Sequence, residues 1–327
     1  MKFCLLALAV CLAASAQDTN AILEGQITDP SGAAISGAVV RAINPANGYT
    51  REQPATQSGA YRLALPVGEY SVHVTAPKFA EYVRSGLQLD VSQVARMDVQ
   101  LRVAKEKDVV TVNATAAVVD SGSTAIGNVV TGRELVDLPL NGRNFTQLGL
   151  LQPGVAPLTA GLAQAGGSLR AGQAYAVNGQ RPESNNYLID GVTNVNRVDG
   201  GYALRTPVDA IQEFRILTET APAEYGGTAG ATTTVVTRSG GNDLHGTVYE
   251  FLRNDALDAR NFFAASTEPL KQNQFGGTLG GPVRRNRDFL FGYYEGFRNR
   301  QGVTQSATVP SDAQRNGDFS GLSQPSD

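Results

Sequence analysis

The sequence contains no tryptophan, and its two cysteines and two histidines are few for 327 residues. Both cysteines, Cys4 and Cys11, lie within the first sixteen residues, so the rest of the chain must be stabilised without disulfide bonds. The histidines, His73 and His245, stand far apart, and no spaced cluster of His, Cys, Asp and Glu suggests a metal or catalytic centre. We therefore expect neither an enzyme nor a bound cofactor.

Charge is also scarce. Charged residues form 17% of the sequence, the net charge is −3, and no run of Lys or Arg marks a nucleic-acid partner. No segment after the first sixteen residues has eighteen consecutive apolar residues, as a transmembrane helix would require. What the sequence does have is a hydrophobic content of 42% and 36 glycines, a composition that fits many short strands and turns.

Residues 1–16 have the features of a secretory signal peptide. Lys2 precedes an apolar run over residues 3–14, and Ala14-Ser15-Ala16 fits the rule for signal cleavage. The alternative is an ordinary buried N-terminal helix. Cleavage predicts a mature chain that begins at Gln17 and is exported.

Residues 20–104 alternate apolar and polar side chains, as strands with one buried face do. Turn signals separate the alternating runs at residues 29–32, 44–48, 58–59 and 66–68. The apolar faces comprise Tyr61, Leu63 and Leu65; Tyr70, Val72, Val74 and Ala76; Leu87, Leu89 and Val91; and Ala95, Met97, Val99, Leu101 and Val103. This pattern predicts a seven-stranded β-sandwich.

Four strings in this segment, GQITDPSG, ISGAVV, GAY and VGEYSV, resemble the carboxypeptidase-regulatory-like, transthyretin-like domain. The resemblance does not imply peptidase activity, because that chemistry needs zinc ligands. His73 is the one histidine here, and its place on a polar face predicts a solvated surface residue. Carbohydrate binding is sometimes attributed to this fold.

Residues 105–114 form a linker between this domain and the next. A charged junction, Lys105-Glu106-Lys107, leads into a stretch rich in β-branched residues that favour an extended chain. That stretch resembles a TonB box, which adds as a strand to an inner-membrane energising protein. The alternatives are a last sandwich strand or a plain linker. The resemblance implies partner binding by Asp108, Val109, Val110, Thr111, Val112, Asn113 and Ala114.

Residues 115–244 mix short helices, strands and a Gly/Ala-rich loop. Helices are expected from Thr131 to a stop at Pro139, over 144–152 and over 207–213, with strands at 177–181, 186–192, 214–218 and 226–240. The strings NNYLIDGV, PVDAIQEFRILT and AEYGGTAGATTTVVTRSG resemble the α+β plug domain of TonB-dependent receptors, and LPLNGRNF resembles their Oar-like branch. Arg181, Glu213 and Arg238 are candidates either for a plug–wall interface or for solvated salt bridges.

Residues 245–327 are the most aromatic part of the chain, and 245–300 hold ten of its 23 Phe and Tyr. Strands expected at 245–254, 273–283 and 288–298 are joined by long and short connections in turn, as in outer-membrane β-barrels. A soluble β-sandwich with one wet face is the alternative. Three strands cannot close a barrel, and a plugged barrel needs about 22, so we expect the chain to continue beyond Asp327.

The fold expected is thus mainly β: a sandwich, a plug, and the first strands of an incomplete transmembrane barrel. The resemblance implies an outer-membrane transporter of a Gram-negative-type bacterium with its first domain in the periplasm. Its partners would be a TonB-like inner-membrane protein, outer-membrane lipid and an unknown transported ligand, without nucleic acid. The alternative is a periplasmic or surface module that binds carbohydrate or protein in an adhesion or structural role.

Overall fold

The structure is a computed structural model of the whole chain. It describes residues 19–104, 109–113, 126–138, 140–157, 175–196, 201–219, 221, 225, 229–260, 267, 269–302 and 309–320. The predicted signal peptide therefore lies outside the described residues. The chain divides into two compact units, one of residues 1–248 with 277–294 and the other of residues 249–276 with 295–327.

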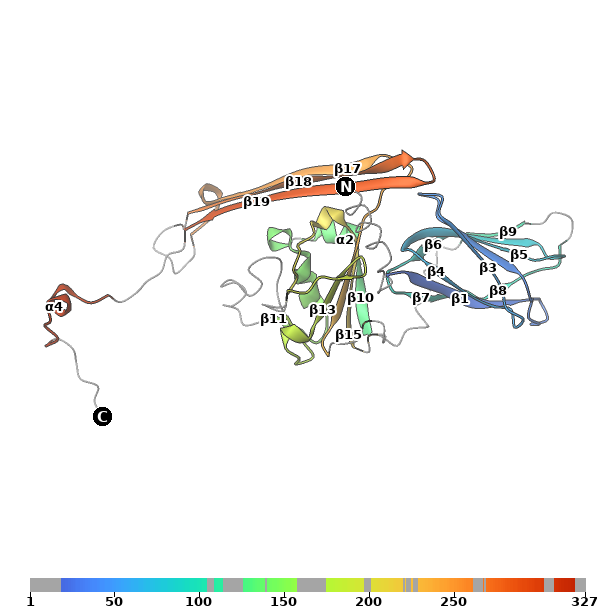
Figure 1. Cartoon of the computed structure of the whole chain (residues 1–327), viewed down its shortest axis with the longest axis horizontal. Helices are drawn as coiled ribbons and strands as arrows, with labels where there is room; N and C mark the ends of the chain where they lie inside the picture. The colour runs from blue at the N-terminus through green and yellow to red at the C-terminus, as the bar shows by residue number, and fades with distance from the viewer. Residues whose placement is uncertain are drawn as a thin grey trace, which may run out of the picture. The chain divides into compact units, whose positions relative to one another are not determined.

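The front domain, residues 19–104 with 109–113, is a sandwich of two β-sheets (Figure 1). In one sheet, β1 (Ala21–Thr28) pairs with β4 (Ala60–Leu65), β7 (Val94–Arg96) and β8 (Val99–Gln100). The other sheet has the order β3 (Thr50–Pro54), β2 (Val39–Ile43), β5 (Gly68–Thr75), β6 (Glu81–Leu89) and β9 (Val109–Asn113).

The prediction of seven strands over residues 20–104 agrees with this sandwich when β7 and β8 are taken as one interrupted strand. Both run parallel to β1, and the break falls at Met97-Asp98. There the Met97 carbonyl accepts a 2.6 Å hydrogen bond from the Tyr61 hydroxyl, and the Asp98 carboxylate accepts one from the Gln26 amide. The Met97 amide still donates to the Glu24 carbonyl of β1, and side chains supply the other hydrogen bonds at the break.

Alternation in the sequence identified most of the front-domain core correctly. Every predicted apolar-face residue from Tyr61 to Leu101 is buried except Ala76, which is half-buried. Val103 is different, because its side chain is 66% exposed. The regular pairing has ended by then, and Val103 makes only an isolated bridge to Phe79. Periodicity therefore extended the last strand too far.

The plug is built on a mixed five-stranded sheet. Its order is β10 (Ile126–Thr131), β15 (Ile211–Glu219), β16 (Thr232–Thr237), β13 (Asn186–Ile189) and β14 (Val192–Thr193). The β13–β16 pair is parallel, and the other three pairs are antiparallel. A separate two-stranded sheet joins β11 (Val155–Pro157) to β12 (Tyr175–Val177).

The plug helices are short. Helix α2 (Gly132–Asp137) is capped by Thr131 as the sequence predicts, with a capping box to Glu134. The helix expected over 144–152 is instead a 3₁₀ helix, η3 (Phe145–Leu151). The described residues also include the one-turn 3₁₀ helices η2 (Asn141–Arg143), η4 (Pro182–Ser184) and η5 (Val208–Ala210). The helix expected over 207–213 is limited to η5, because strand β15 already begins at Ile211.

All four expected plug strands have different bounds in the structure. The strand expected at 186–192 ends at Ile189, and the one expected at 214–218 covers Ile211–Glu219. The strand expected at 177–181 ends at Val177, because Asn178 and Gly179 have positive φ angles of 51° and 76° and turn the chain. The strand expected at 226–240 covers only Thr232–Thr237. The turn at Asn178 and Gly179 thus ends the strand expected at 177–181, and the strand expected at 226–240 is shorter than expected at both ends.

The wall region forms a three-stranded sheet of β17 (His245–Asn254), β18 (Leu270–Arg284) and β19 (Asp288–Gln301), in that order (Figure 1). Residues 285–287 form the short turn between β18 and β19, and the longer connection after β17 includes η7 (Asp255–Leu257). One short helix follows, α4 (Asp312–Arg315). The expected fold class, a sandwich followed by a plug and three strands of an open barrel wall, is confirmed.

Replacing Leu63 by Ala tests the front-domain core. Its side chain is fully buried, so the change removes apolar contacts and leaves a cavity. We expect the free energy of unfolding of the 327-residue chain to fall by about 2–5 kcal/mol in urea titration. The exposed Val103→Ala change is the matched control and should stay within about 0.5 kcal/mol. Equal losses in both variants would contradict the assigned core.

Candidate functional site

The predicted coupling segment lies at the edge of the front domain. Its residues 109–113 form β9, which runs parallel to β6 in a register that pairs Glu81 with Val109 and Ser85 with Asn113. Asp108 and Ala114 lie outside the described residues. The segment is therefore extended, and it is also the last strand of a sandwich sheet, the alternative that the sequence left open. Its partner-binding role stays a prediction.

After β9, the next element of the chain in the described residues is β10, at the edge of the plug sheet. From Asn113 to Ile126 is 126 − 113 = 13 steps, which an extended chain spans in at most about 45 Å. β10 lies unusually close to β15, since a Cβ on Gly127 would overlap the Ile216 carbonyl. Glycine is thus required where the linker meets the plug.

The string LPLNGRNF has a structural explanation in the plug. Gly142 and Arg143 adopt positive φ angles of 63° and 52°, which redirect the chain. Asn144 then caps η3 by accepting hydrogen bonds from the Thr146 amide and hydroxyl. Phe145 is fully buried beside two other rings, with centroid distances of 5.3 Å to Tyr202 and 5.7 Å to Phe214. The motif therefore turns, caps and anchors one segment.

The same motif supplies an ion pair. Arg143 and Asp209 are joined by a 2.5 Å contact between Nη2 and Oδ2, and their side chains are 13% and 8% exposed. Removing only one partner of such a shielded pair strongly destabilises the fold, because the other charge stays buried without a partner. The ion pair ties the LPLNGRNF turn to η5, directly before β15.

Other plug signature residues also hold backbone in place. Asp190 and Gly191 form a turn after β13, with φ angles of 48° and 78°. The Asp190 carboxylate also accepts 2.8 Å hydrogen bonds from the Thr237 amide and hydroxyl. Asn185 donates to the Tyr175 carbonyl and accepts from the Ala231 amide. These polar groups fix strand ends, a role that pattern alone did not assign.

A turn of the front domain is held by the plug strand β15. The Val91 amide donates a 2.8 Å hydrogen bond to Glu213 Oε2, and the Val91 carbonyl accepts a 2.7 Å bond from Arg215 Nη1. Next to it, the Ser92 hydroxyl contacts the Tyr225 hydroxyl. Val91 is fully buried, and Glu213 and Arg215 are 3% and 6% exposed. We call this contact the Val91 clamp.

The clamp corrects the expectation for Glu213, whereas Arg238 and Arg181 have different surroundings. Glu213 was a candidate for a plug–wall interface, but its carboxylate contacts the front domain. Arg238 contacts the plug itself, donating through Nε to the Ile211 carbonyl. Arg181 is the exposed N-cap residue of η4. Two-residue spacing on a strand could have grouped Glu213 with Arg215, but no sequence signal named Val91 as their partner.

Burial governs the ionisation of Glu213. Removal from water raises the pKa of its carboxyl from 4.5 to about 7, and the negative charge of Asp90 acts in the same direction. The hydrogen bond from the Val91 amide and the charge of Arg215 oppose the shift without cancelling it. The clamp therefore contains a carboxyl that titrates near neutral pH.

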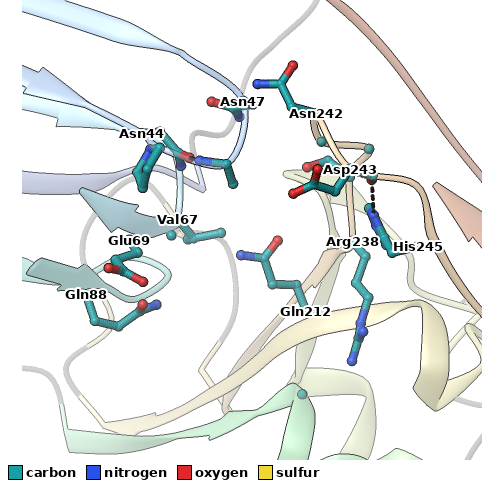
Figure 2. Close-up of a pocket in the computed structure, with 17 residues that line it drawn as sticks. Asn44, Asn47, Val67, Glu69, Gln88, Gln212, Arg238, Asn242, Asp243 and His245 are labelled. Atoms are coloured by element: carbon teal, nitrogen blue, oxygen red, sulfur yellow. Dashed lines mark hydrogen bonds between the residues drawn. The ribbon is translucent and has the colours of Figure 1, made fainter. Parts of the chain in front are cut away.

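A cavity of about 560 Å³ is lined by residues of both the front domain and the plug. Its front-domain side includes Asn44, Glu69 and Gln88, and its other side includes Gln212, Arg238 and His245 (Figure 2). The His245 ring nitrogen Nδ1 lies 3.0 Å from the Asp243 carbonyl. Amides and charges of both signs line this space, so it suits water or a polar ligand better than an apolar one.

Near this cavity, one front-domain turn touches the segment that leads into the wall. The Asn242 amide donates a 2.9 Å hydrogen bond to the Ala46 carbonyl. The Asn242 side chain in turn exchanges two hydrogen bonds with Asn286 in the turn between β18 and β19, at 2.7 and 2.8 Å. Asn242 therefore links the front domain, the plug exit and the first barrel turn.

The described residues contain neither a membrane-spanning helix nor a metal-binding cluster. No helix in them is long and apolar enough to cross a membrane. In the same ranges, no group of three or more His, Cys, Asp or Glu side chains is placed to hold a metal ion. His73 is paired with Glu81, with 2.8 Å between Nδ1 and Oε1.

Three families match consecutive parts of the chain. Residues 22–102 match the Carboxypeptidase regulatory-like domain, 112–233 the TonB-dependent Receptor Plug Domain, and 236–326 the Outer membrane beta barrel domain. The chain belongs to the TonB-dependent receptors. The matches indicate that this receptor is located in the outer membrane.

The receptor is similar to the TonB-dependent transporter Oar of Myxococcus xanthus, with 25% identity over 287 residues. The match covers 83% of the chain and 25% of Oar, so the chain spans about a quarter of that relative's length.

Among solved structures, the siderophore receptor PirA from Acinetobacter baumannii is 24% identical with a TM-score of 0.40, over 54% of this chain and 25% of PirA. A carbohydrate binding protein from Bacteroides uniformis, described as putative, is 17% identical with a TM-score of 0.22, over 25% of this chain and 40% of that protein.

The Glu213→Gln variant tests the clamp through its pH dependence. Because the pKa of Glu213 is raised on folding, its stabilising effect is complete below about pH 4.5 and is lost as the pH rises through about 7. A shift of this size corresponds to on the order of 3 kcal/mol. Gln keeps an oxygen that can accept from Val91 but cannot ionise, so this part of the pH dependence should disappear.

The measurement is chemical unfolding of the 327-residue chain between pH 4.5 and 8, comparing the original chain with Glu213→Gln. Asp90→Asn is the matched control, since Asp90 influences Glu213 without sharing its hydrogen bond. Asp90→Asn should lower the pH midpoint at which stability is lost, while the pH-dependent loss of stability itself remains. Parallel pH profiles for the original chain and Glu213→Gln would contradict the buried position of Glu213.

Proposed function

We propose that this chain is the N-terminal part of a TonB-dependent transporter that takes up a ligand across the outer membrane. The supporting observation is the continuity of plug and wall. The last plug strand, β16, ends at Thr237, and the first wall strand, β17, begins at His245, so only residues 238–244 separate them. A plug attached this closely to its barrel is suited to block the pore at rest and to form part of the ligand site.

Residues 108–114 would be the coupling segment in this proposal. An inner-membrane TonB-like protein binds them and pulls, and the pull reaches the plug through the linker at β10. Among the described strands, β10 is an edge strand that pairs with β15 alone, whereas β15 is paired on both sides. Detaching an edge strand breaks one ladder of backbone hydrogen bonds, so β10 is the plug strand that a pull would release first.

The front domain would lie in the periplasm and influence this coupling. Its contacts with the plug through the Val91 clamp support that role, because they connect the domain that carries β9 to the strand that supports β10. The outer membrane lipid surrounds the wall strands, and the transported ligand is of unassigned chemistry. Nothing in this mechanism requires enzymatic catalysis, a cofactor or nucleic acid.

A binding module is the second candidate. A hollow of about 520 Å³ on the front domain is lined by side chains that include Gln26, Gln53, Arg62 and Arg96, which could hydrogen-bond to sugar hydroxyls. Tyr61, the aromatic ring at this hollow, is only 4% exposed and offers no stacking surface. The transporter role therefore has the stronger support, since it also accounts for the plug and the wall.

The coupling role can be tested by replacing residues 108–114 with a Gly-Ser sequence of equal length. The purified periplasmic domain of the host's TonB-like protein is titrated onto the 327-residue chain. Loss of the β-branched strand should weaken binding by at least about tenfold. The same replacement of residues 118–124 is the control for linker flexibility and should leave affinity unchanged. An unaltered dissociation constant after replacement of 108–114 would exclude the coupling role.

A further inference from the structure

Strand β9 has one edge in use. A β-strand presents two rows of backbone N–H and C=O groups, one toward each side. In β9, the row that faces β6 is engaged over five register pairs, from Glu81–Val109 to Ser85–Asn113. β9 ends the sheet order β3-β2-β5-β6-β9, so within the described residues no strand pairs with its other row.

This arrangement differs from a free peptide whose two edges are both unpaired. The segment is extended, as a strand-adding peptide must be, but the front domain already holds it in that form. β6 is itself fixed by antiparallel pairing with β5 along most of its length. β9 therefore extends an existing sheet and offers a preformed edge.

We propose that the partner strand adds to the outer edge of β9 while β9 remains in the front-domain sheet. The inference rests on the proposed coupling function and specifies its docking site, which is the edge of a folded domain and not a detached peptide. The occupant is an extended strand of the TonB-like protein, which becomes the sixth strand of the sheet.

The energetic argument is preorganisation. Ordering the backbone of a free segment costs about 1–2 kcal/mol per residue, which a disordered five-residue peptide must offset on binding. In β9 that cost is met by pairing with β6 before the partner arrives. Addition of a strand to an exposed sheet edge is also an established form of peptide recognition.

A consequence concerns how force enters the molecule. A partner bound to a detached peptide would pull on the linker alone. A partner bound to β9 in the sheet pulls on the front domain as well, and the front domain grips β15 through the Val91 clamp. Force can then reach the plug sheet at β10 through the linker and at β15 through the clamp.

A disulfide lock between β6 and β9 distinguishes docking in place from release. Val83 and Thr111 are register partners, and adjacent strands bring paired Cα atoms within the range of a disulfide. Because both native cysteines precede residue 17, a chain of residues 17–327 with Val83→Cys and Thr111→Cys has one possible pair. Val83 pairs with His73 on the side of the sheet away from the core, so the change spares the core.

The locked and reduced chains are titrated with the purified periplasmic domain of the TonB-like protein. We expect the dissociation constants to agree within about threefold, since β9 need not leave β6. The matched control lock joins Arg41→Cys to His73→Cys, register partners on β2 and β5 of the same sheet. It reports any effect of a crosslink that does not involve β9.

Loss of binding by at least about tenfold in the oxidised β6–β9 lock, with recovery on reduction, would overturn the inference and leave the coupling function standing. Failure of the unmodified chain to bind would overturn both. A second measurement needs no mutation. In the complex, the amides of β6 should stay protected from hydrogen exchange, whereas exposure of residues 81–85 on binding would show that β9 had left and would refute docking in place.

Discussion

The plug depends on β15, because this strand is hydrogen-bonded on both sides and its side chains serve two different surroundings. Its backbone pairs with β10 and β16. Phe214 enters the aromatic core, while Glu213 and Arg215 on the opposite face hold Val91 of the front domain. One strand thus carries the plug core, the clamp and the edge at which the linker arrives, so a change at β15 affects all three.

Much of this fold was predictable because alternation with period two survives wherever one face of a strand is buried. Leu63, Val72 and Leu89 were assigned to a core by spacing alone, and each is fully buried. The prediction failed where pairing stops before the pattern does, as at Val103. It also failed where a left-handed turn ends a strand, as at Asn178. Local spacing contains no information on where a neighbouring strand ends.

The candidate site was less predictable, because it depends on contacts between residues distant in sequence. Glu213 and Val91 are separated by 122 positions, and Asn242 and Asn286 by 44. The segment 108–114 was identified by composition, yet its pairing with β6 could not be read from it, since seven residues of β-branched character suit a free peptide and an edge strand equally well. Only the long-range strand register, which composition does not contain, identifies β6 as the neighbour of this segment.

The absence of cysteine after residue 16 has a mechanical consequence. No disulfide crosslinks this part of the chain, and in the described residues the front domain is held to the plug sheet by hydrogen bonds such as those of the Val91 clamp. Each of these bonds can be broken and re-formed without redox chemistry, so under the proposed coupling a plug that is pulled out of place would return to its starting structure unaided. A single disulfide between β10 and β15 would instead prevent these two strands from separating.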